Sequence, residues 1–430
     1  MRHRRDRLST LAGALLGLLV AASAHARNVE WRNGRWYDGE SFAPRAMYSV
    51  DGVLTERRPI SIDSTVDLAG QYVVPAYGDA HHHGIDSADG LETKIARFLE
   101  VGVFYVKNPN VIPDLLTDEV RGRINTGRSI DVVFANGGLT ASGGHPAPLH
   151  ASLAARGVFK GLRPEDMENR AYFIIDSIDD LKVKWPRILA GRPDFIKTFL
   201  LYSAPHGTGE ARKRSEGLDP GVLTEIVARA HRDGLRVTTH IETAIDFDRA
   251  VRAGVDEITH LPIPDRAVSP DLGDYLISAT SAREAARRDV TVVATGNIFD
   301  RPQFKLAGEN PEPAYLAAIR DNQRANLRML ADAGVRIAIG SDGISGEQPM
   351  VTALDEVQYL HRYGFFDARE LLRMWTEHTA ATIFPDRRIG RLQEGYEADF
   401  LVLQGDPLVD FSNVSRIALR VRQGEVLGTD

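Results

Sequence analysis

The chain contains no cysteine, so neither disulfide bonds nor thiolate metal ligands contribute to it. A transition-metal site in this protein must therefore be built from histidine, carboxylates or a modified lysine. Basic residues are also in deficit, with 52 Lys and Arg against 59 Asp and Glu. This balance argues against a nucleic-acid partner, because such proteins carry basic patches or stripes.

A hydrophobic run long enough to cross a membrane is missing as well. The apolar stretch from Leu11 to Ala22 is too short to span a bilayer. Four arginines precede it, and Ala24-His25-Ala26 follows it as a small-x-small cleavage site. This pattern predicts a signal peptide over residues 1–26, cleaved before Arg27, and a periplasmic or secreted protein. A retained membrane anchor is the alternative, and the Sec and twin-arginine export routes both stay open.

Cleavage at that point removes four arginines and one aspartate, which changes the formal net charge from −7 to −10. The remaining chain, about 400 residues long, is large enough for one barrel and a small accessory domain. We expect a small-molecule substrate and no stable membrane span after cleavage. Self-association into a homo-oligomer stays open.

Short, continuously apolar runs alternate with amphipathic helical stretches through the middle of the chain. This pattern is typical of βαβ units with a parallel sheet covered on both faces. We expect eight strands, at about residues 72–81, 101–107, 130–137, 194–201, 235–240, 256–260, 291–296 and 336–342. The fold class is therefore α/β, with residues 71–387 forming a (β/α)8 TIM-like barrel.

Two helices of this region have readable caps. Asp219-Pro220 supplies an N-cap and a first-turn proline, and Gly234 ends the same helix. Asp367 and Glu370 form a capping-box pattern before the next apolar face.

The flanks of the chain differ from its middle. Residues 27–70 contain short alternating segments separated by Asn33-Gly34, Asp38-Gly39 and Asp51-Gly52, which are hairpin turn sequences. Residues 388–430 resume that style. We therefore expect the two ends to pair into one small split β-sandwich domain beside the barrel.

The sequence Asp79-Ala80-His81-His82-His83 directly follows an apolar run. Alternate side chains of a strand share a face, roughly 6 to 7 Å apart. His81 and His83 can therefore reach one metal ion while His82 points away. Three adjacent histidines in a solvated turn or a buried patch are the alternative.

Four further potential ligands stand where later apolar runs end: Lys197, His240, His260 and Asp342. Taken singly, each has a plain structural reading as a salt-bridge partner, a core histidine or a turn residue. The carboxyl ends of barrel strands, however, are where active sites of such barrels are assembled. Three residues beyond the third and fourth strands are candidates for substrate contact: His145, Tyr202 and His206.

The order HxH, Lys, His, His, Asp on successive strand ends resembles the amidohydrolase superfamily of metal-dependent hydrolases. Residues 67–75 resemble the family's entry into the barrel, and residues 390–403 resemble its exit. Phe195-Ile196-Lys197 and Ser142-Gly143-Gly144-His145 are similar to the imidazolonepropionase-like and prolidase-like members. Two departures are Ala76, where glycine is usual, and Val106-Lys107-Asn108-Pro109 in place of an acidic stretch.

The resemblance implies two divalent metal ions, for which zinc is expected given the nitrogen-rich ligand set. It assigns His81 and His83 to one ion and His240 and His260 to the other, with Lys197 bridging both as a carbamate. It implies that Asp342 binds the first ion and acts as the catalytic acid–base on a metal-bridging hydroxide.

These expectations together describe an exported amidohydrolase that cleaves a C–N bond in an amide or dipeptide-like substrate. A lactonase or phosphotriesterase on the same fold is one alternative. A non-catalytic periplasmic metal-binding protein is another, although storage does not need an aspartate aimed at a hydroxide.

Overall fold

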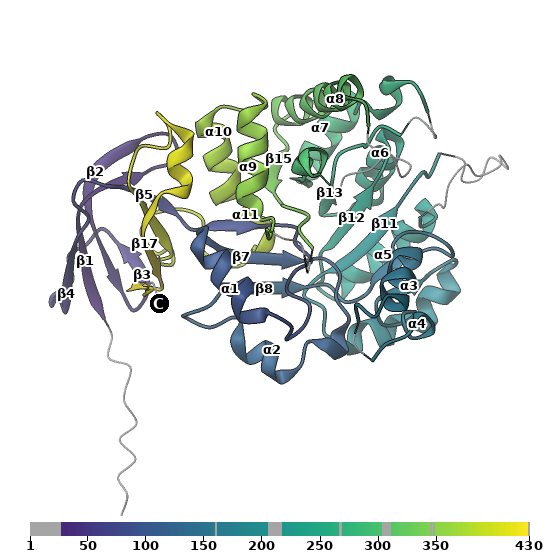
Figure 1. The fold of residues 1–430 in the computed structure, drawn as a ribbon, viewed down its shortest axis with the longest axis horizontal. Helices are drawn as coiled ribbons and strands as arrows, with labels where there is room; N and C mark the ends of the chain where they lie inside the picture. The colour runs from purple at the N-terminus through teal and green to yellow at the C-terminus, as the bar shows by residue number, and fades with distance from the viewer. Residues whose placement is uncertain are drawn as a thin grey trace, which may run out of the picture.

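The computed structural model describes residues 27–159, 161–204, 217–265, 269–302, 311–344, 346 and 349–428. Three sheets organise these residues. One is built from both ends of the chain, and the other two carry the middle of the chain (Figure 1). Within the described ranges, no helix combines the length and the apolar character that crossing a membrane requires.

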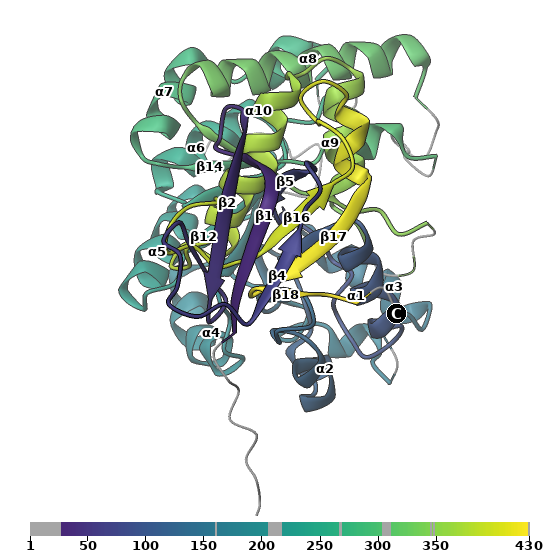
Figure 2. The same ribbon diagram turned by 90° about the vertical axis from the view of Figure 1, so that its left-hand side faces the viewer.

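The sheet made by the chain ends has eight strands in the order β18-β17-β16-β5-β1-β2-β3, with β4 paired to β1. Figure 2 shows this sheet against the rest of the molecule, with purple N-terminal and yellow C-terminal strands adjacent. Its strands are β1 (Asn28–Tyr37), β2 (Phe42–Val50), β3 (Val53–Thr55), β4 (Ser64–Asp67), β5 (Tyr72–Pro75), β16 (Phe400–Leu403), β17 (Ile417–Arg422) and β18 (Glu425–Val426).

Antiparallel pairing of β16 with β5 joins the two ends of the chain. Phe400, on β16, packs against Trp31 and Trp36 of β1, with ring centroids 5.0 and 5.2 Å apart. All three side chains are fully buried. The structure thus places strands from the two flanks of the chain in one eight-stranded sheet.

The two other sheets are parallel. One has the order β6-β7-β8, and the other has the order β10-β9-β11-β12-β13-β14-β15. Their strands are β6 (Tyr77–Asp79), β7 (Val103–Asn108), β8 (Asp131–Phe134), β9 (Gly138–Thr140), β10 (Tyr172–Ile174), β11 (Ile196–Leu200), β12 (Val237–Ile241), β13 (Glu257–Thr259), β14 (Thr291–Ala294) and β15 (Arg336–Ile339).

Backbone hydrogen bonds connect the two parallel sheets at two places. Beside β6 and β15, the amide of Ala80 donates to the carbonyl of Ile339 over 2.9 Å. Between β8 and β11, the amide of Asp194 donates to the carbonyl of Phe134 over 2.8 Å. Because the strands run parallel, the residues that follow them gather at one edge.

Helices pack around these strands (Figure 1). The α-helices are α1 (Leu91–Glu100), α2 (Asp118–Arg123), α3 (Ala147–Ala155), α4 (Ile178–Ala190), α5 (Pro220–Arg232), α6 (Ala244–Ala253), α7 (Ala279–Arg287), α8 (Pro313–Asp332), α9 (Ala353–Arg362), α10 (Ala368–Arg373) and α11 (Thr379–Ile383). The short helical segments are η1 (Pro113–Leu115), η2 (Pro164–Asp166), η3 (Leu272–Tyr275), η4 (Gly296–Asp300), η5 (Met374–His378) and η6 (Phe411–Ser415).

The two predicted caps are confirmed. The side chain of Asp219 accepts hydrogen bonds from the amides of Gly221 and Val222, in the first turn of α5. Asp367 and Glu370 form a reciprocal capping box at the start of α10.

The strand predictions need two corrections. The run at residues 72–81 is two strands, because β5 joins the sheet of the chain ends while β6 joins a parallel sheet. The amide of Ala76, between them, donates to the carbonyl of Asp399. Strands β9 and β10, each three residues long, were not predicted.

Candidate active site

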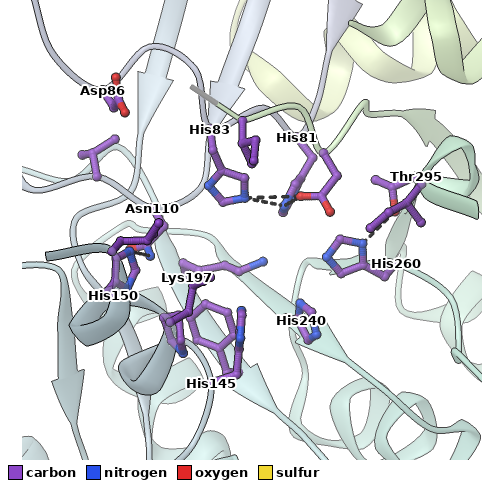
Figure 3. Close-up of a pocket in the computed structure, with 18 of the residues that line it drawn as sticks. His81, His83, Asp86, Asn110, His145, His150, Lys197, His240, His260 and Thr295 are labelled. Carbon is purple, nitrogen blue, oxygen red and sulfur yellow. Dashed lines mark hydrogen bonds and ion pairs between the residues drawn. The ribbon is translucent and has the colours of Figure 1, made fainter. Parts of the chain in front are cut away.

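His81 and His83 follow β6 and place their ring nitrogens together. The two Nε2 atoms lie 3.2 Å apart (Figure 3). His82 points the other way, with its ring against Phe98 and its Nε2 3.1 Å from the carbonyl oxygen of Val351. The alternation along the extended chain is therefore as predicted.

Asp342 follows β15 and meets both histidines. Its Oδ1 lies 3.4 Å from the Nε2 atom of His81 and 3.4 Å from that of His83. One ligand atom from each of the three residues falls within 4.8 Å of the others, which forms a candidate metal site. Burial alone raises the pKa of the Asp342 carboxyl, but hydrogen bonds from the two imidazoles hold that pKa well below its usual range.

Lys197 projects from β11 into the same region (Figure 3) and is 2% exposed. Its Nζ atom has no hydrogen-bond partner among the residues that the structure describes. Burial lowers the pKa of this amine to about 7, because an ammonium group loses its hydration there. A large fraction of the side chain is therefore neutral near neutral pH, which is the state that reacts with carbon dioxide.

His240, in β12, and His260, directly after β13, lie next to one another. Their ring centroids are 4.5 Å apart, and the ring of His260 lies 5.0 Å from that of His81. Burial lowers the pKa of His240 to about 3 and that of His260 well below its usual value. Both imidazoles are therefore neutral at physiological pH, as metal ligation requires.

Each of these two imidazoles has a hydrogen-bonding neighbour that sequence reasoning missed. The Nε2 atom of His240 lies 3.0 Å from Oε1 of Glu242. The Nδ1 atom of His260 lies 2.7 Å from Oγ1 of Thr295. Glu242 had a usable signal, since it stands two residues beyond a strand-end histidine. Thr295 had none, because threonine is common at strand ends.

The backbone around Asp342 is held from several sides. Asp342 has a φ of +53°, a left-handed conformation that few non-glycine residues adopt. Arg301 donates to its carbonyl oxygen over 3.1 Å and also to that of Ser341. The side-chain amide of Asn297 donates to the Ser341 carbonyl over 3.0 Å. Glu356, on α9, in turn accepts both the main-chain and the side-chain amide of Asn297.

Hydrogen bonds to Asp79 connect the end of β6 to the segment that follows β15. Its carboxylate accepts the amide of Ser341 over 2.9 Å and that of Ala353 over 3.0 Å. Burial raises the pKa of this carboxyl to about 7. Backbone hydrogen bonds to Asp79 therefore hold the segment of His81 and His83 next to the segment of Asp342, in addition to the contacts between the side chains of these three residues.

A cavity of about 520 Å³ opens over these residues. All six predicted ligand positions line it: His81, His83, Lys197, His240, His260 and Asp342. The structure therefore brings together the set that the strand ends predict.

The three residues predicted to contact substrate differ in their position relative to the cavity. His145 lines the cavity, with its ring 5.4 Å from that of His240, and burial lowers its pKa to about 3. Tyr202 is not among the residues that line the cavity, and its amide donates to Asp246. His206 lies outside the described residues.

Asn110 and His150 also line the cavity and were not predicted (Figure 3). The Asn110 Oδ1 atom accepts the amide of Gly138 over 3.0 Å, and its Nδ2 atom lies 3.4 Å from Nε2 of His150. Lys107, in the stretch that departs from the family pattern, is not a lining residue. Its Nζ atom pairs instead with both carboxylate oxygens of Glu257, each over 2.9 Å.

The sequence matches the profile of the amidohydrolase family over residues 194–427, more than half of the chain. The ochratoxinase of Aspergillus niger is 26% identical over 192 residues, which are 44% of this chain and 37% of that protein. A 5'-deoxyadenosine deaminase of Methanopyrus kandleri is 34% identical over 83 residues, 18% of this chain and 19% of that protein. The chain thus spans well under half the length of these curated relatives.

Solved structures are similar over nearly the whole chain, at identities that show the fold alone. An amidohydrolase structure has a TM-score of 0.70 at 20% identity, covering 94% of this chain and 99% of the other. The A. niger ochratoxinase has a TM-score of 0.70 at 19% identity, covering 93% of this chain and 95% of the other. A prolidase complexed with N-methylphosphonate-L-proline has a TM-score of 0.69 at 20% identity, covering 94% and 100%. With a profile match over more than half of its length, this chain belongs to the amidohydrolase family.

Proposed function

We propose that this protein is an exported, metal-dependent hydrolase that cleaves the C–N bond of an amide or dipeptide-like substrate. The observation that carries this proposal is the convergence of His81 and His83 on Asp342, beside the buried amine of Lys197. The family supports a hydrolase, and the ochratoxinase and prolidase among the similar proteins support an amide substrate. We also propose that β6 and β15 close a (β/α)8 barrel, which the Ala80–Ile339 hydrogen bond supports.

The residues present fit two divalent ions. His81, His83 and Asp342 would hold one ion, and His240 and His260 the other. The four histidines supply nitrogen donors, of the kind that zinc prefers. Lys197, once it has reacted with carbon dioxide, would give each ion one carbamate oxygen, which accounts for a buried amine that lacks a partner among the described residues. When bound, the ions would supply a water molecule acidic enough to react at neutral pH and would polarise the scissile carbonyl.

The side chains of this chain perform the remaining tasks. The Asp342 carboxylate, whose low pKa keeps it ionised, accepts the proton of the attacking water and returns it to the departing amine. His145, neutral and packed against Phe199 and His240, offers a ring nitrogen at the cavity wall that orients the substrate. Burial of these groups excludes bulk water from the reacting atoms.

The walls of the cavity indicate the kind of amide. Many of its lining side chains are apolar: Val111, Ile112, Leu115, Leu149, Leu153, Val158, Phe159, Leu261, Ile263, Ile298, Phe299 and Ile344. Three of them are exposed, Leu149, Val158 and Ile344. Such a lining favours a substrate with bulky apolar groups. The cationic side chains among the lining residues are Lys197 and Arg156, and Arg156 suits a substrate carboxylate.

The test is a metal-content measurement coupled to a substrate panel. Protein purified from the exported fraction should begin at Arg27 and contain close to two divalent ions per chain by elemental analysis. Among dipeptides, N-acyl amino acids, lactones and phosphotriesters, amides that carry bulky apolar groups should have the highest kcat/KM. A content of one ion with full activity would contradict the two-ion site. Preference for lactones or phosphotriesters would contradict the proposed bond.

A further inference from the structure

Glu242 is a carboxylate inside the cavity that the mechanism above does not use. It stands one residue beyond β12 and two beyond His240, and its side chain is 20% exposed. Its backbone is fixed at both ends. The amide of Glu242 donates to Asp246 over 3.3 Å, and its carbonyl oxygen accepts the amide of Ile263 over 3.0 Å. The backbone that carries the carboxylate is therefore held by hydrogen bonds on both sides.

The contact between Glu242 and His240 selects one tautomer of the imidazole. Oε1 of Glu242 lies 3.0 Å from Nε2 of His240. An ionised carboxylate can only accept hydrogen bonds, so Nε2 must carry the hydrogen atom. The lone pair of the neutral ring then resides on Nδ1. In His260 the other ring nitrogen makes the contact, since Nδ1 lies 2.7 Å from Oγ1 of Thr295, and a hydroxyl that can donate or accept selects neither tautomer.

The same 3.0 Å contact would also be found if Glu242 and His240 both ligated an ion. The geometry favours positioning over ligation. Among the described residues, the set of three donors whose ligand atoms lie within 4.8 Å of one another is His81, His83 and Asp342. Glu242 does not form such a set with His240 and His260.

We infer that Glu242 is a positioning residue, which holds His240 as the Nε2–H tautomer and presents Nδ1 to the second metal ion. This inference rests on the proposed two-ion site. Carboxylates that bind the far nitrogen of a ligating histidine fix the ring orientation and raise ligand basicity. Loss of such a partner typically lowers metal affinity by about 10- to 100-fold.

The first experiment measures zinc affinity by chelator competition in the wild type, Glu242→Ala and Glu242→Gln. Glu242→Ala should retain the tighter ion and bind the other about 10- to 100-fold more weakly. Glu242→Gln should recover most of that affinity, because its amide oxygen can accept the same hydrogen bond. Asp86→Ala is the matched control, since Asp86 lines the same cavity but pairs with Lys94; its two affinities should equal those of the wild type.

The second experiment observes the tautomer directly in metal-free protein. Long-range ¹H–¹⁵N spectra should show His240 protonated on Nε2 in the wild type and should show a mixture of tautomers in Glu242→Ala. A wild-type ring protonated on Nδ1 would overturn the inference whatever the metal content. Unchanged zinc affinities in Glu242→Ala would overturn the inference too. If that variant also had a raised KM, Glu242 would be a substrate contact. A wild type that binds one ion contradicts the proposed function instead.

Discussion

At the scale of single residues, the left-handed backbone of Asp342 makes it a favourable position for a precise test. Asparagine is among the few residues that tolerate this conformation, so Asp342→Asn preserves both the backbone and the side-chain volume. The change removes the carboxylate that accepts the proton of the attacking water. We expect kcat to fall by roughly 10² or more, while the ion held by His240 and His260 is retained. Steady-state kinetics and elemental analysis on the same preparation measure both quantities.

Near-normal kcat in Asp342→Asn with both ions present would contradict the assigned role. Another group would then have to move the proton, and His145 is the first to examine because its neutral ring lines the same cavity. Loss of fold would be visible in the far-ultraviolet circular dichroism spectrum. It is not expected, because Asp79 and Arg301 hold the neighbouring backbone independently of the Asp342 carboxylate.

The residues that could be predicted are those whose position follows from a strand. His81, His83, Lys197, His240, His260 and Asp342 each close an apolar run, and parallel strands bring such ends to one edge. The partners that orient them could not be predicted in the same way. Thr295 follows β14 without any distinguishing pattern, and Asn110 meets His150 only because α3 folds back over the cavity.

At the scale of elements, Glu356 of α9 holds the short helix η4 and through it the loop that carries Asp342. Its carboxylate accepts the amides of Gly296 and Asn297 over 2.9 and 2.6 Å. Burial raises its pKa from 4.5 to about 7. Between these pH values the folded state keeps a proton that the unfolded chain has released. The free energy of unfolding therefore falls as pH rises through this window, and the loss is complete above about pH 7.

This linkage predicts how the wild type and Glu356→Gln differ. The stability of the wild type relative to Glu356→Gln should decrease by about 2 to 3 kcal/mol between pH 5 and pH 8. Urea denaturation of both proteins at several pH values measures the difference, and other titrating groups cancel in it. Parallel pH profiles would show that Glu356 does not titrate in this range.

The two errors in the strand predictions have different physical causes. Residues 72–77 form one apolar run because both β5 and β6 are buried, so no polar residue marks the change from one sheet to the other. The division is set by the pairing of β5 with β16, from the far end of the chain. β9 and β10 are each shorter than the four to eight residues over which strand patterns become recognisable.

At the scale of the whole molecule, Arg422 connects the sheet of the chain ends to the parallel sheets. Its guanidinium, 1% exposed, lies 2.6 Å from Asp131 at the start of β8 and 3.7 Å from Asp399. Arg422→Met keeps the approximate length of the side chain but leaves two buried carboxylates without this cation. We expect the free energy of unfolding to fall by about 3 to 5 kcal/mol, as is usual when one partner of a buried ion pair is lost.

Chemical denaturation measures this loss, and a second substitution serves as its control. Adding Asp399→Asn to Arg422→Met removes one of the two buried carboxylates that have lost the Arg422 guanidinium. This second substitution should restore part of the free energy of unfolding. Arg387 also pairs with Asp131 over 2.6 Å, and neither substitution removes that partner. A loss below about 1 kcal/mol, the range of exposed ion pairs, would contradict a buried connection.

The two strands that pair as β5 and β16 are synthesised at very different times. More than 320 residues separate Pro75 from Phe400. At the usual rate of 5 to 20 residues per second, a ribosome needs roughly 15 to 65 s to produce the second strand after the first. During that interval the nascent chain presents the unpaired edge of β5 and the uncovered rings of Trp31 and Trp36. Exposed strand edges pair with other chains. The late-synthesised strand β16 is therefore what protects the early strands β1 and β5 from aggregation.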